Sequence, residues 1–438
     1  MRALREAIAG GSIRAHEGVV VAFQRIEALD GSLNAFVTAR PEAVREAEGA
    51  RGPLAGVPVG LKDAFVHAGR APTMGSRVHA EGMRGTAAVV ERLCAAGAVI
   101  AGYTNLHEWA VGTTSIETAT GPIRNPWNTD HVAGGSSGGS AAALAAGLVP
   151  AALGTDLGGS IRVPAACCGV VGLKPTWGLV PTTGYAGDGG DIDHVGPMAR
   201  TVADVRSLLE VVAPADYSAP DVSALAVGVP RSYFFDDVEP ETGRIVEEAI
   251  ALLGKRVRRV VEIEIASVET TRYAITALAL PFLAGLVGDA LVDRADELQP
   301  EVAQVLTLGA QMPEEDRAQG RDARAAISSG WAETFEQVDV VVTPTLPAPP
   351  ALISEKTVAL PSGTASADLS YIALNAPMNL GGVPCLTLPC GETAEGWSVG
   401  ASLTAAAGRD STVLALGAEL EALLDGAYAN RIAPAAPS

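Results

Sequence analysis

The chain has 438 residues, of which 48% are hydrophobic and 18% charged, and its formal charge is −19 at pH 7. This apolar content is sufficient for a large core and excludes a largely disordered chain. Proteins bind nucleic acids by neutralising phosphates with Lys and Arg, so the strong negative charge argues against a nucleic-acid partner.

The first 50 residues are predicted to form an N-terminal helical layer. Apolar residues recur at helical spacing, and Pro41 stands where a helix tolerates a missing N–H, which predicts helices over 2–9, 14–29 and 41–50. The apolar run 54–61 is then typical of a buried strand, and it ends at Lys62.

Helical and strand patterns alternate along the rest of the chain. Helices are expected over 86–97, 140–148 and 239–253, in several pieces between 269 and 336, and over 410–425. Strands are expected over 98–103, 170–173, 225–229, 258–264, 339–343, 384–389 and 398–403. This alternation predicts an α/β fold, a single large α/β/α domain with a twisted, mixed, mostly parallel sheet covered by helices on both faces.

No repeat or low-complexity linker divides the chain, so we expect one domain over 1–438. The motifs that carry chemistry fall within 52–204. A helical insertion over 205–335 is expected to shape the substrate site, and 336–438 to complete the sheet with strands and a helix. The Pro-rich stretch 344–361 is predicted to be a loop.

The five cysteines show no C-x-x-C spacing, and an odd number in a large chain is typical of the reducing cytoplasm. The N-terminus lacks the apolar segment of a signal peptide. The apolar stretches 140–154 and 275–288 contain Gly and Pro and are shorter than the ~20 residues of a membrane span. We therefore expect a cytoplasmic protein without membrane contact, as a monomer or homodimer.

Ser160 follows Asp156-Leu-Gly-Gly in a glycine-rich run. A Gly-Gly-Ser sequence alone usually marks only a turn. Here the small residues can present successive N–H groups to an oxyanion, so we predict that Ser160 attacks a carbonyl group. The oxyanion hole is predicted to be the backbone amides of Leu157, Gly158, Gly159 and Ser160.

Ser136 and Ser137 lie in a second such run, Gly134-Gly-Ser-Ser-Gly-Gly. Gly134-x-Ser136-x-Gly138 also matches the nucleophile elbow of α/β-hydrolases, in which an acid and then a histidine follow the serine. Of the six histidines only His194 lies downstream. This spacing disfavours the α/β-hydrolase alternative.

Lys62 is the remaining candidate base. A single lysine at a strand end is ordinarily a surface residue, but Lys62 follows an apolar run, and burial lowers the pKa of a lysine. A neutral Lys62 could take a proton from Ser136, which would take one from Ser160.

Other residues have supporting or structural interpretations. Asp156 and Arg162 flank Ser160 and are expected to form a buried ion pair that fixes its loop. The stretch 275–288 is either a core helix, the simpler interpretation, or the wall of an acyl pocket. The sequence contains neither a His-Glu-x-x-His metal motif nor a P-loop, so we predict a hydrolase without metal or other cofactor.

These residues resemble the amidase signature family. The resemblance is carried by Gly56-Val-Pro-Val-Gly-Leu-Lys-Asp63, Asn125-Pro-Trp-Asn128, the run from Gly134 to Ala143, Gly154-Thr-Asp-Leu-Gly-Gly-Ser-Ile-Arg-Val-Pro-Ala165, Gly169-Val-Val-Gly-Leu-Lys-Pro175 and Gly196-Pro-Met198. It implies a Ser–cisSer–Lys triad of Ser160, Ser136 and Lys62, with Ser137 hydrogen-bonded near the lysine. It also implies one α/β/α domain.

Two segments depart from the family pattern. Residues 185–193 are glycine-rich and acidic where the tRNA-linked members have Ser-Ser-Leu-Asp. Val399-Gly-Ala-Ser-Leu403 stands where many members have Val-Gly-Leu-Gln. Both segments could border the pocket, so the scissile group stays open.

We predict an amidase that cleaves linear amides of small molecules, with aryl amides, esters and small carbamates (urethanes) as further substrates. The alternative is the glutaminase subunit of a tRNA-dependent amidotransferase, against which the charge, the altered 185–193 segment and the short chain weigh. A catalytically inactive scaffold is a third possibility, disfavoured because all three triad positions are filled.

Overall fold

The computed structural model describes residues 1–188, 190–424, 426–427 and 431–434. Position 425, the predicted end of the last helix, and Gly189 of the 185–193 segment lie outside this range.

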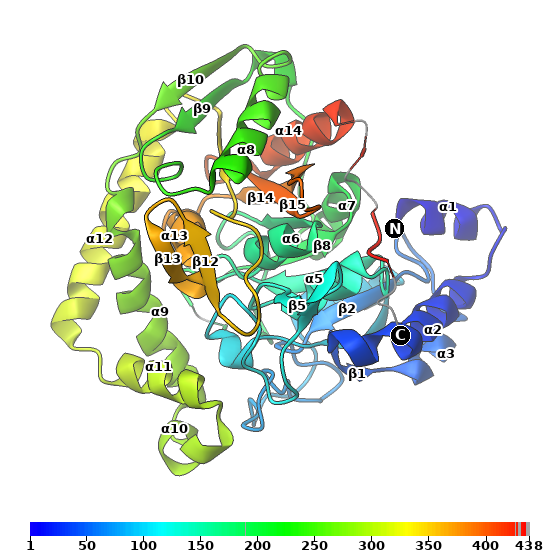
Figure 1. Ribbon diagram of the computed structural model, residues 1–438. Helices are drawn as coiled ribbons and strands as arrows, with labels where there is room; N and C mark the ends of the chain where they lie inside the picture. The colour runs from blue at the N-terminus through cyan, green and yellow to red at the C-terminus, as the bar shows by residue number, and fades with distance from the viewer. Residues whose placement is uncertain (189, 425, 428–430, 435–438) are drawn as a thin grey trace.

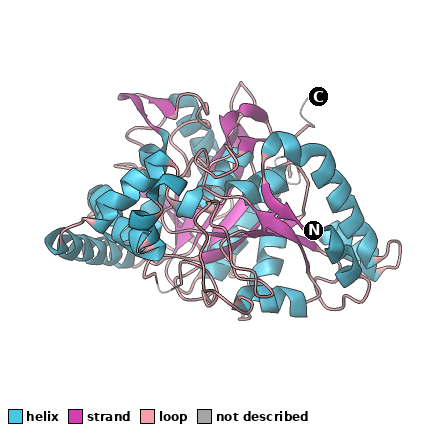
Figure 2. Cartoon of the chain, turned by 90° about the horizontal axis from the view of Figure 1, so that it is seen from below, coloured by secondary structure: helices cyan, strands magenta, loops and turns pink. Residues whose placement is uncertain are grey.

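An eleven-stranded sheet forms the centre of the molecule. Its spatial order is β1 (Phe36–Ala39), β3 (Val99–Thr104), β2 (Pro58–Lys62), β6 (Ala151–Thr155), β8 (Val195–Ala199), β7 (Val171–Lys174), β14 (Cys385–Glu392), β15 (Ser398–Ala405), β11 (Val340–Pro344), β9 (Ala226–Pro230) and β10 (Arg259–Ile263). Figure 2 shows these strands running through the middle of the molecule between helices.

The sheet is mixed, and its parallel parts lie on the two flanks. Strands β3, β2 and β6 are parallel neighbours, and so are β11, β9 and β10. The pairs β6–β8, β8–β7, β7–β14, β14–β15 and β15–β11 between these flanks are antiparallel, as is β1–β3 at one edge. The predicted α/β class with a mixed sheet is confirmed. The parallel pairs lie on the two flanks, because the strands at the centre of the sheet are antiparallel.

Helices cover both faces of the sheet (Figure 1). One face carries α4 (Ala88–Ala95), α7 (Val202–Val212), α8 (Pro240–Leu253) and α14 (Asp410–Leu423). The other carries α2 (Ala15–Leu33), α5 (Gly138–Ala145), α6 (Arg162–Cys168), α13 (Ala367–Leu380) and α9 (Thr271–Val287). Strand alternation separates the two cores, because Val340 and Val342 of β11 pack with α7, α8 and α14, whereas Val341 packs with α9 and α13.

The remaining elements lie at the ends of the sheet. The N-terminal layer consists of α1 (Arg2–Ala9), α2, the 3₁₀ turn Pro41–Ala43 and α3 (Val44–Ala47), and lies at the right of Figure 1. At the left, α10 (Ala290–Asp293), α11 (Pro300–Ala310) and α12 (Glu314–Thr334) accompany α9. Two small hairpins complete the fold, β4 (Arg124–Asn125) with β5 (Asn128–Val132) and β12 (Thr357–Leu360) with β13 (Gly363–Ser366).

Two predicted segments differ from the structure in detail. The range 205–335 is not wholly helical, because β9 and β10 join the central sheet and only residues beyond 268 form a continuous helical layer. The predicted loop 344–361 ends in strand β12.

The segment Val268–Val287, which includes α9, is long and apolar enough to cross a membrane by length and composition alone. In the fold, α9 packs against α11, α12 and α13. These contacts are those of a core helix.

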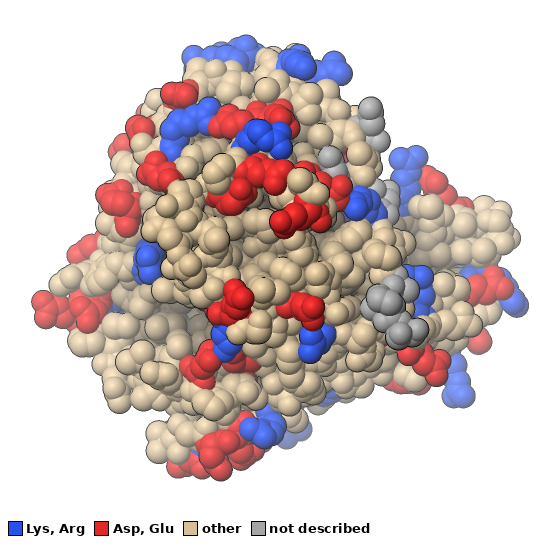
Figure 3. Space-filling view, in the orientation of Figure 1, with Lys and Arg blue, Asp and Glu red and all other residues tan. Residues whose placement is uncertain are grey.

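Acidic and basic side chains are interspersed on the face of the molecule shown in Figure 3, with uncharged surface between them. Surface ion pairs of the described chain include Arg231 with Glu262 and Arg206 with Glu210. On this face basic side chains gather along the top of the view, and several others lie next to acidic ones. This distribution agrees with the net charge of −19.

Candidate active site

Two polar side chains, those of Lys62 and Thr155, lie close together at the C-terminal ends of the neighbouring strands β2 and β6. Because these strands are parallel neighbours, their C-terminal residues, Lys62 and Thr155, emerge side by side. Lys62 Nζ lies 2.8 Å from Ser136 Oγ and 2.7 Å from Thr155 Oγ1, and these three side chains are buried. The amino group is therefore hydrogen-bonded to two hydroxyls and shielded from water.

The loop before α5 carries Ser136 and Ser137. The Gly135–Ser136 peptide bond is cis, as the family resemblance implies. Ser137 N–H donates to the carbonyl of Ser160 (3.0 Å), and Ser137 Oγ donates to the carbonyl of Thr155 (3.2 Å). The structure thus brings Lys62, Ser136, Ser137 and Ser160 into one cluster, and Ser160 retains 6% of its exposure.

Burial changes the charge state of Lys62. Desolvation lowers its pKa to about 7, although the carboxylates of Asp193 and Asp156 act in the opposite direction. A large fraction of Lys62 is then neutral near pH 7, which is the form that can accept a proton from a serine hydroxyl.

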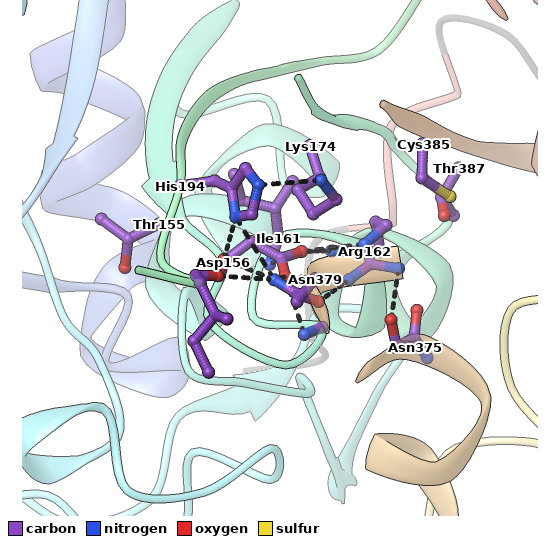
Figure 4. A network of polar contacts seen from close by, with 12 residues as sticks. Thr155, Asp156, Ile161, Arg162, Lys174, His194, Asn375, Asn379, Cys385 and Thr387 are labelled. Carbon is purple, nitrogen blue, oxygen red and sulfur yellow. Dashed lines mark hydrogen bonds and ion pairs between the residues drawn. The ribbon is translucent and has the colours of Figure 1, made fainter. Parts of the chain in front are cut away.

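Asp156 organises the loop that ends in Ser160 (Figure 4). Its carboxylate accepts the amides of Gly159 (2.8 Å) and Ile161 (3.1 Å). Arg162 Nη2 lies 2.9 Å from Oδ1 and its Nε 3.0 Å from Oδ2, and Asn379 donates to the same carboxylate (2.9 Å). The two charged side chains have no exposed surface, so the loop is fixed by a fully buried ion pair.

The charge of Asp156 is stabilised by these partners. Burial alone would raise its pKa, but the guanidinium of Arg162 and the amide of Asn379 hold the pKa below the ordinary aspartate value. Asp156 is therefore ionised at neutral pH and pairs with Arg162 rather than exchanging protons with the serines.

The amides of the loop divide into two groups. Gly159 N–H already donates to Asp156. The amides of Leu157, Gly158 and Ser160 make no hydrogen bond to any residue that the structure describes. These three are the free donors for an oxyanion, whereas Gly159 could act only as a shared donor.

His194 does not take part in a serine–histidine pair. Its Nε2 lies 3.0 Å from Lys174 Nζ, and its Nδ1 lies 3.1 Å from the carbonyl of Asp156 (Figure 4). Within the described part of the chain, neither ring nitrogen reaches a serine hydroxyl. Burial lowers the pKa of Lys174 to about 7 and that of His194 well below its usual value. The pair contacts the loop that carries Ser160 through the hydrogen bonds of His194 to the backbone of Asp156.

An apolar wall lies beside the loop that carries Ser160. A Cβ atom placed on Gly158 would lie 3.7 Å from Ile275 of α9 and 3.9 Å from Ala376 of α13. One on Gly190 would lie 2.8 Å from Phe282 of α9. Helix α9, predicted as a core helix or an acyl-pocket wall, therefore packs in the core and also approaches the loop that carries Ser160.

The sequence analysis assigned no role to Thr155, Lys174, Tyr185 or Asp193. Thr155 and Lys174 stand within motifs that carry the family resemblance, and Tyr185 and Asp193 are the two ends of the segment expected to border the pocket. Their positions beside Lys62 and Asp156 depend on the fold. No group of three or more His, Cys, Asp or Glu side chains suited to a metal ion occurs among the described residues.

Sequence comparisons match nearly the whole chain to known proteins. A family model described as "Amidase" matches residues 17–414. A curated relative from Chloroflexus aggregans, named as a glutamyl-tRNA(Gln) amidotransferase subunit, is 35% identical over 481 aligned residues, which cover 97% of this chain and 96% of the relative.

Solved structures show the same architecture. A structure described as "Crystal structure of amidase" superposes with a TM-score of 0.90 at 32% identity, covering 95% of this chain and 98% of that one. A glutamyl-tRNA(Gln) amidotransferase subunit from Thermotoga maritima gives a TM-score of 0.79 at 29% identity, covering 93% of this chain and 91% of that one.

Proposed function

Because this chain belongs to the amidase signature family, we propose that it hydrolyses the C–N bond of a linear amide through an acyl-enzyme on Ser160. The observation that carries the proposal is the buried amine of Lys62, 2.8 Å from the hydroxyl of Ser136. A desolvated lysine beside a serine is a base poised near neutral pH.

In the proposed reaction, neutral Lys62 accepts the proton of Ser136 while Ser136 accepts the proton of Ser160. Ser160 Oγ forms a bond to the carbonyl carbon, and the oxyanion is bound by the free amides of Leu157, Gly158 and Ser160. Ser136 returns a proton to the departing nitrogen as the C–N bond breaks, and water then hydrolyses the ester on Ser160.

One interpretation of the substrate is an amide with an apolar acyl group. The wall formed by Ile275 and Ala376 beside Gly158 supports it, because apolar side chains cannot compensate the charges of a zwitterion. Aryl amides, esters and small carbamates present the same carbonyl to Ser160 and extend this interpretation.

The second interpretation is a glutaminase subunit that supplies ammonia to a tRNA-dependent partner. The curated relatives, named as glutamyl-tRNA(Gln) amidotransferase subunits, favour this interpretation over a stand-alone amidase. The chemical step at Ser160 is the same in both.

A substrate screen separates the two interpretations. Purified protein is assayed for ammonia or amine release from glutamine, apolar primary amides, anilides, an ester and a carbamate. A stand-alone amidase turns over apolar amides without a partner, with kcat/KM above that for glutamine. Preference for glutamine, with a co-purifying partner protein, supports the second interpretation.

Ser160→Ala is the control for every substrate. Its loss of turnover, with an unchanged thermal unfolding midpoint, assigns the activity to this site. Turnover that survives this substitution would contradict both interpretations.

A further inference from the structure

Tyr185 and Asp193, at the two ends of the 185–193 segment, form a buried hydrogen-bonded pair. Tyr185 Oη donates to Asp193 Oδ2 (2.7 Å), and the other carboxylate oxygen accepts the amide of His194 (2.9 Å). Each residue is 3% exposed. Neither is used in the mechanism above.

Backbone pairing places both residues beside the strand ends that carry Lys62 and Thr155. Tyr185 forms an isolated β-bridge with Phe65, three residues after Lys62, and His194, next to Asp193, exchanges two backbone hydrogen bonds with Asp156, next to Thr155. Lys62 Nζ itself donates to Thr155 Oγ1 (2.7 Å), so the lysine lies between the segments to which Tyr185 and Asp193 are tied.

We propose that Tyr185 and Asp193 are positioning residues of the triad lysine, and that the Asp193 carboxylate sets the pH at which Lys62 becomes a neutral base. The proposal rests on the function proposed for Ser160. It assigns a role to the 185–193 segment, whose sequence departs from the family pattern.

Asp193 differs from the other carboxylate near Lys62 in having no ion-pair partner among the described residues. Two carboxylates act on the lysine, those of Asp193 and Asp156. Asp156 is compensated by Arg162 at 2.9 Å, whereas Asp193 has no Lys or Arg nitrogen within ion-pair distance in the described chain. The uncompensated charge of Asp193 is thus the one that favours the protonated form of Lys62.

Tyr185 and His194 keep one charge state in the relevant range, whereas Lys174, 3.0 Å from His194 Nε2, titrates near the same pH as Lys62 because burial lowers its pKa to about 7. Burial and the Asp193 carboxylate raise the pKa of Tyr185 well above its usual value, and burial keeps His194 neutral by lowering its pKa. Burial raises the pKa of Asp193 to about 6, close to the value of about 7 for Lys62, so the two groups titrate as a pair.

The direction in which a substitution shifts the pKa of Lys62 follows from this arrangement. Asp193→Asn removes the negative charge but keeps an oxygen that can accept from Tyr185. The ammonium form of Lys62 loses stabilisation, so its pKa falls and the neutral base forms at lower pH. Tyr185→Phe removes a donor from Asp193, which raises the pKa of that carboxyl and shifts the lysine in the same direction by a smaller amount.

The test measures how fast a fluorophosphonate probe labels Ser160 between about pH 5 and 9, because labelling reports serine activation without a known substrate. For the wild type, the rate constant is expected to rise with a midpoint near pH 7. For Asp193→Asn the midpoint is expected about one pH unit lower, with a smaller shift for Tyr185→Phe.

Asp322→Asn is the matched control, since Asp322 is exposed on α12 and its substitution changes the net charge equally. Its midpoint is expected to equal that of the wild type. Uniformly slower labelling of Asp193→Asn with an unchanged midpoint, or a shift to higher pH, would overturn the proposal. If Asp193→Asn does not fold, as judged by its thermal unfolding, the Tyr185→Phe midpoint decides in the same way.

Failure of the proposed function gives a different result. If wild-type Ser160 is not labelled at any pH, the reaction assigned to the site is wrong, and this inference falls with it. A labelled wild type whose midpoint is insensitive to both substitutions overturns only the role of Tyr185 and Asp193.

Discussion

Asp156 and Arg162 form an ion pair wholly excluded from solvent, with Arg162 Nη2 2.9 Å from Asp156 Oδ1. The same carboxylate accepts the amides of Gly159 and Ile161, on either side of Ser160. The pair therefore couples the stability of the fold to the conformation of the loop that carries Ser160.

Asp156→Asn is expected to lower the free energy of unfolding by about 3–5 kcal/mol, because it leaves the guanidinium of Arg162 buried without its counter-ion. It should also abolish labelling of Ser160, since the loop loses its anchor. Urea unfolding followed by fluorescence and by circular dichroism measures the first effect.

The exposed pair Arg206–Glu210 on α7 provides the control. Glu210→Gln is expected to change the free energy of unfolding by less than about 1 kcal/mol. An equally small loss for Asp156→Asn would show that the buried pair does not stabilise the fold.

The pH dependence of kcat/KM is expected to follow the neutral fraction of Lys62. Below about pH 7 the rate should rise roughly tenfold per pH unit, and above it should level off, because burial has lowered the lysine pKa to about 7. The measurement uses whichever substrate the screen identifies. A profile that is flat between about pH 6 and 9, with chemistry rate-limiting, would count against lysine as the base.

Replacing Ser160 and replacing Ser136 are expected to affect labelling by a fluorophosphonate differently. Ser160→Ala should give no covalent adduct with a fluorophosphonate. Ser136→Ala retains the nucleophile but breaks its link to Lys62, so labelling should continue about 10²–10⁴-fold more slowly. Intact mass spectrometry over time measures both. Equal labelling of Ser136→Ala and the wild type would remove Ser136 from the proton path.

Two adjacent glycines test the wall beside the loop. Gly158→Ala places a methyl group in ordinary contact with Ile275 and Ala376, so the fold should persist and KM for bulky acyl groups should rise. Gly159→Ala meets Asn375 Cβ at 2.7 Å with φ of +125°, so it should cost about 1–3 kcal/mol of stability or more.

Unfolding midpoints and KM values for a short and a bulky amide distinguish these outcomes. If Gly158→Ala leaves the ratio of the two KM values unchanged, the acyl group of the substrate does not lie against α9.

The helices and strands with strong patterns were predictable from sequence. The Val340–Val342 run, the amphipathic 240–253 helix and the apolar run ending at Lys62 all form the expected elements. The strands β1, β6 and β8 and the helices α6, α7 and α13 were not predicted. Strand β6, for example, is Ala-Ala-Leu-Gly-Thr, whose small residues have no clear strand preference and acquire it from neighbours on both sides.

The residues of the candidate site were likewise only partly predictable from the sequence. Lys62, Ser136 and Ser160 stand in contiguous motifs, so their resemblance to a family was visible along the chain. The surroundings of Thr155, Tyr185 and Asp193 depend on which strands are neighbours, because β8 enters the sheet beside β6 and brings Asp193 to the end of β6, one strand away from β2. Sequence spacing cannot show that adjacency.

The proposed mechanism depends on a neutral Lys62, and NMR titration of lysine carbons tests it most directly. The chain has only four lysines, Lys62, Lys174, Lys255 and Lys356, so protein labelled with ¹³C at the lysine ε position gives few signals, and Lys62→Met assigns one of them. The Lys62 signal is expected to titrate with a midpoint near pH 7, because burial lowers the pKa of its amine. A Lys62 midpoint above about pH 10, the range of an ordinary exposed lysine, would contradict the mechanism.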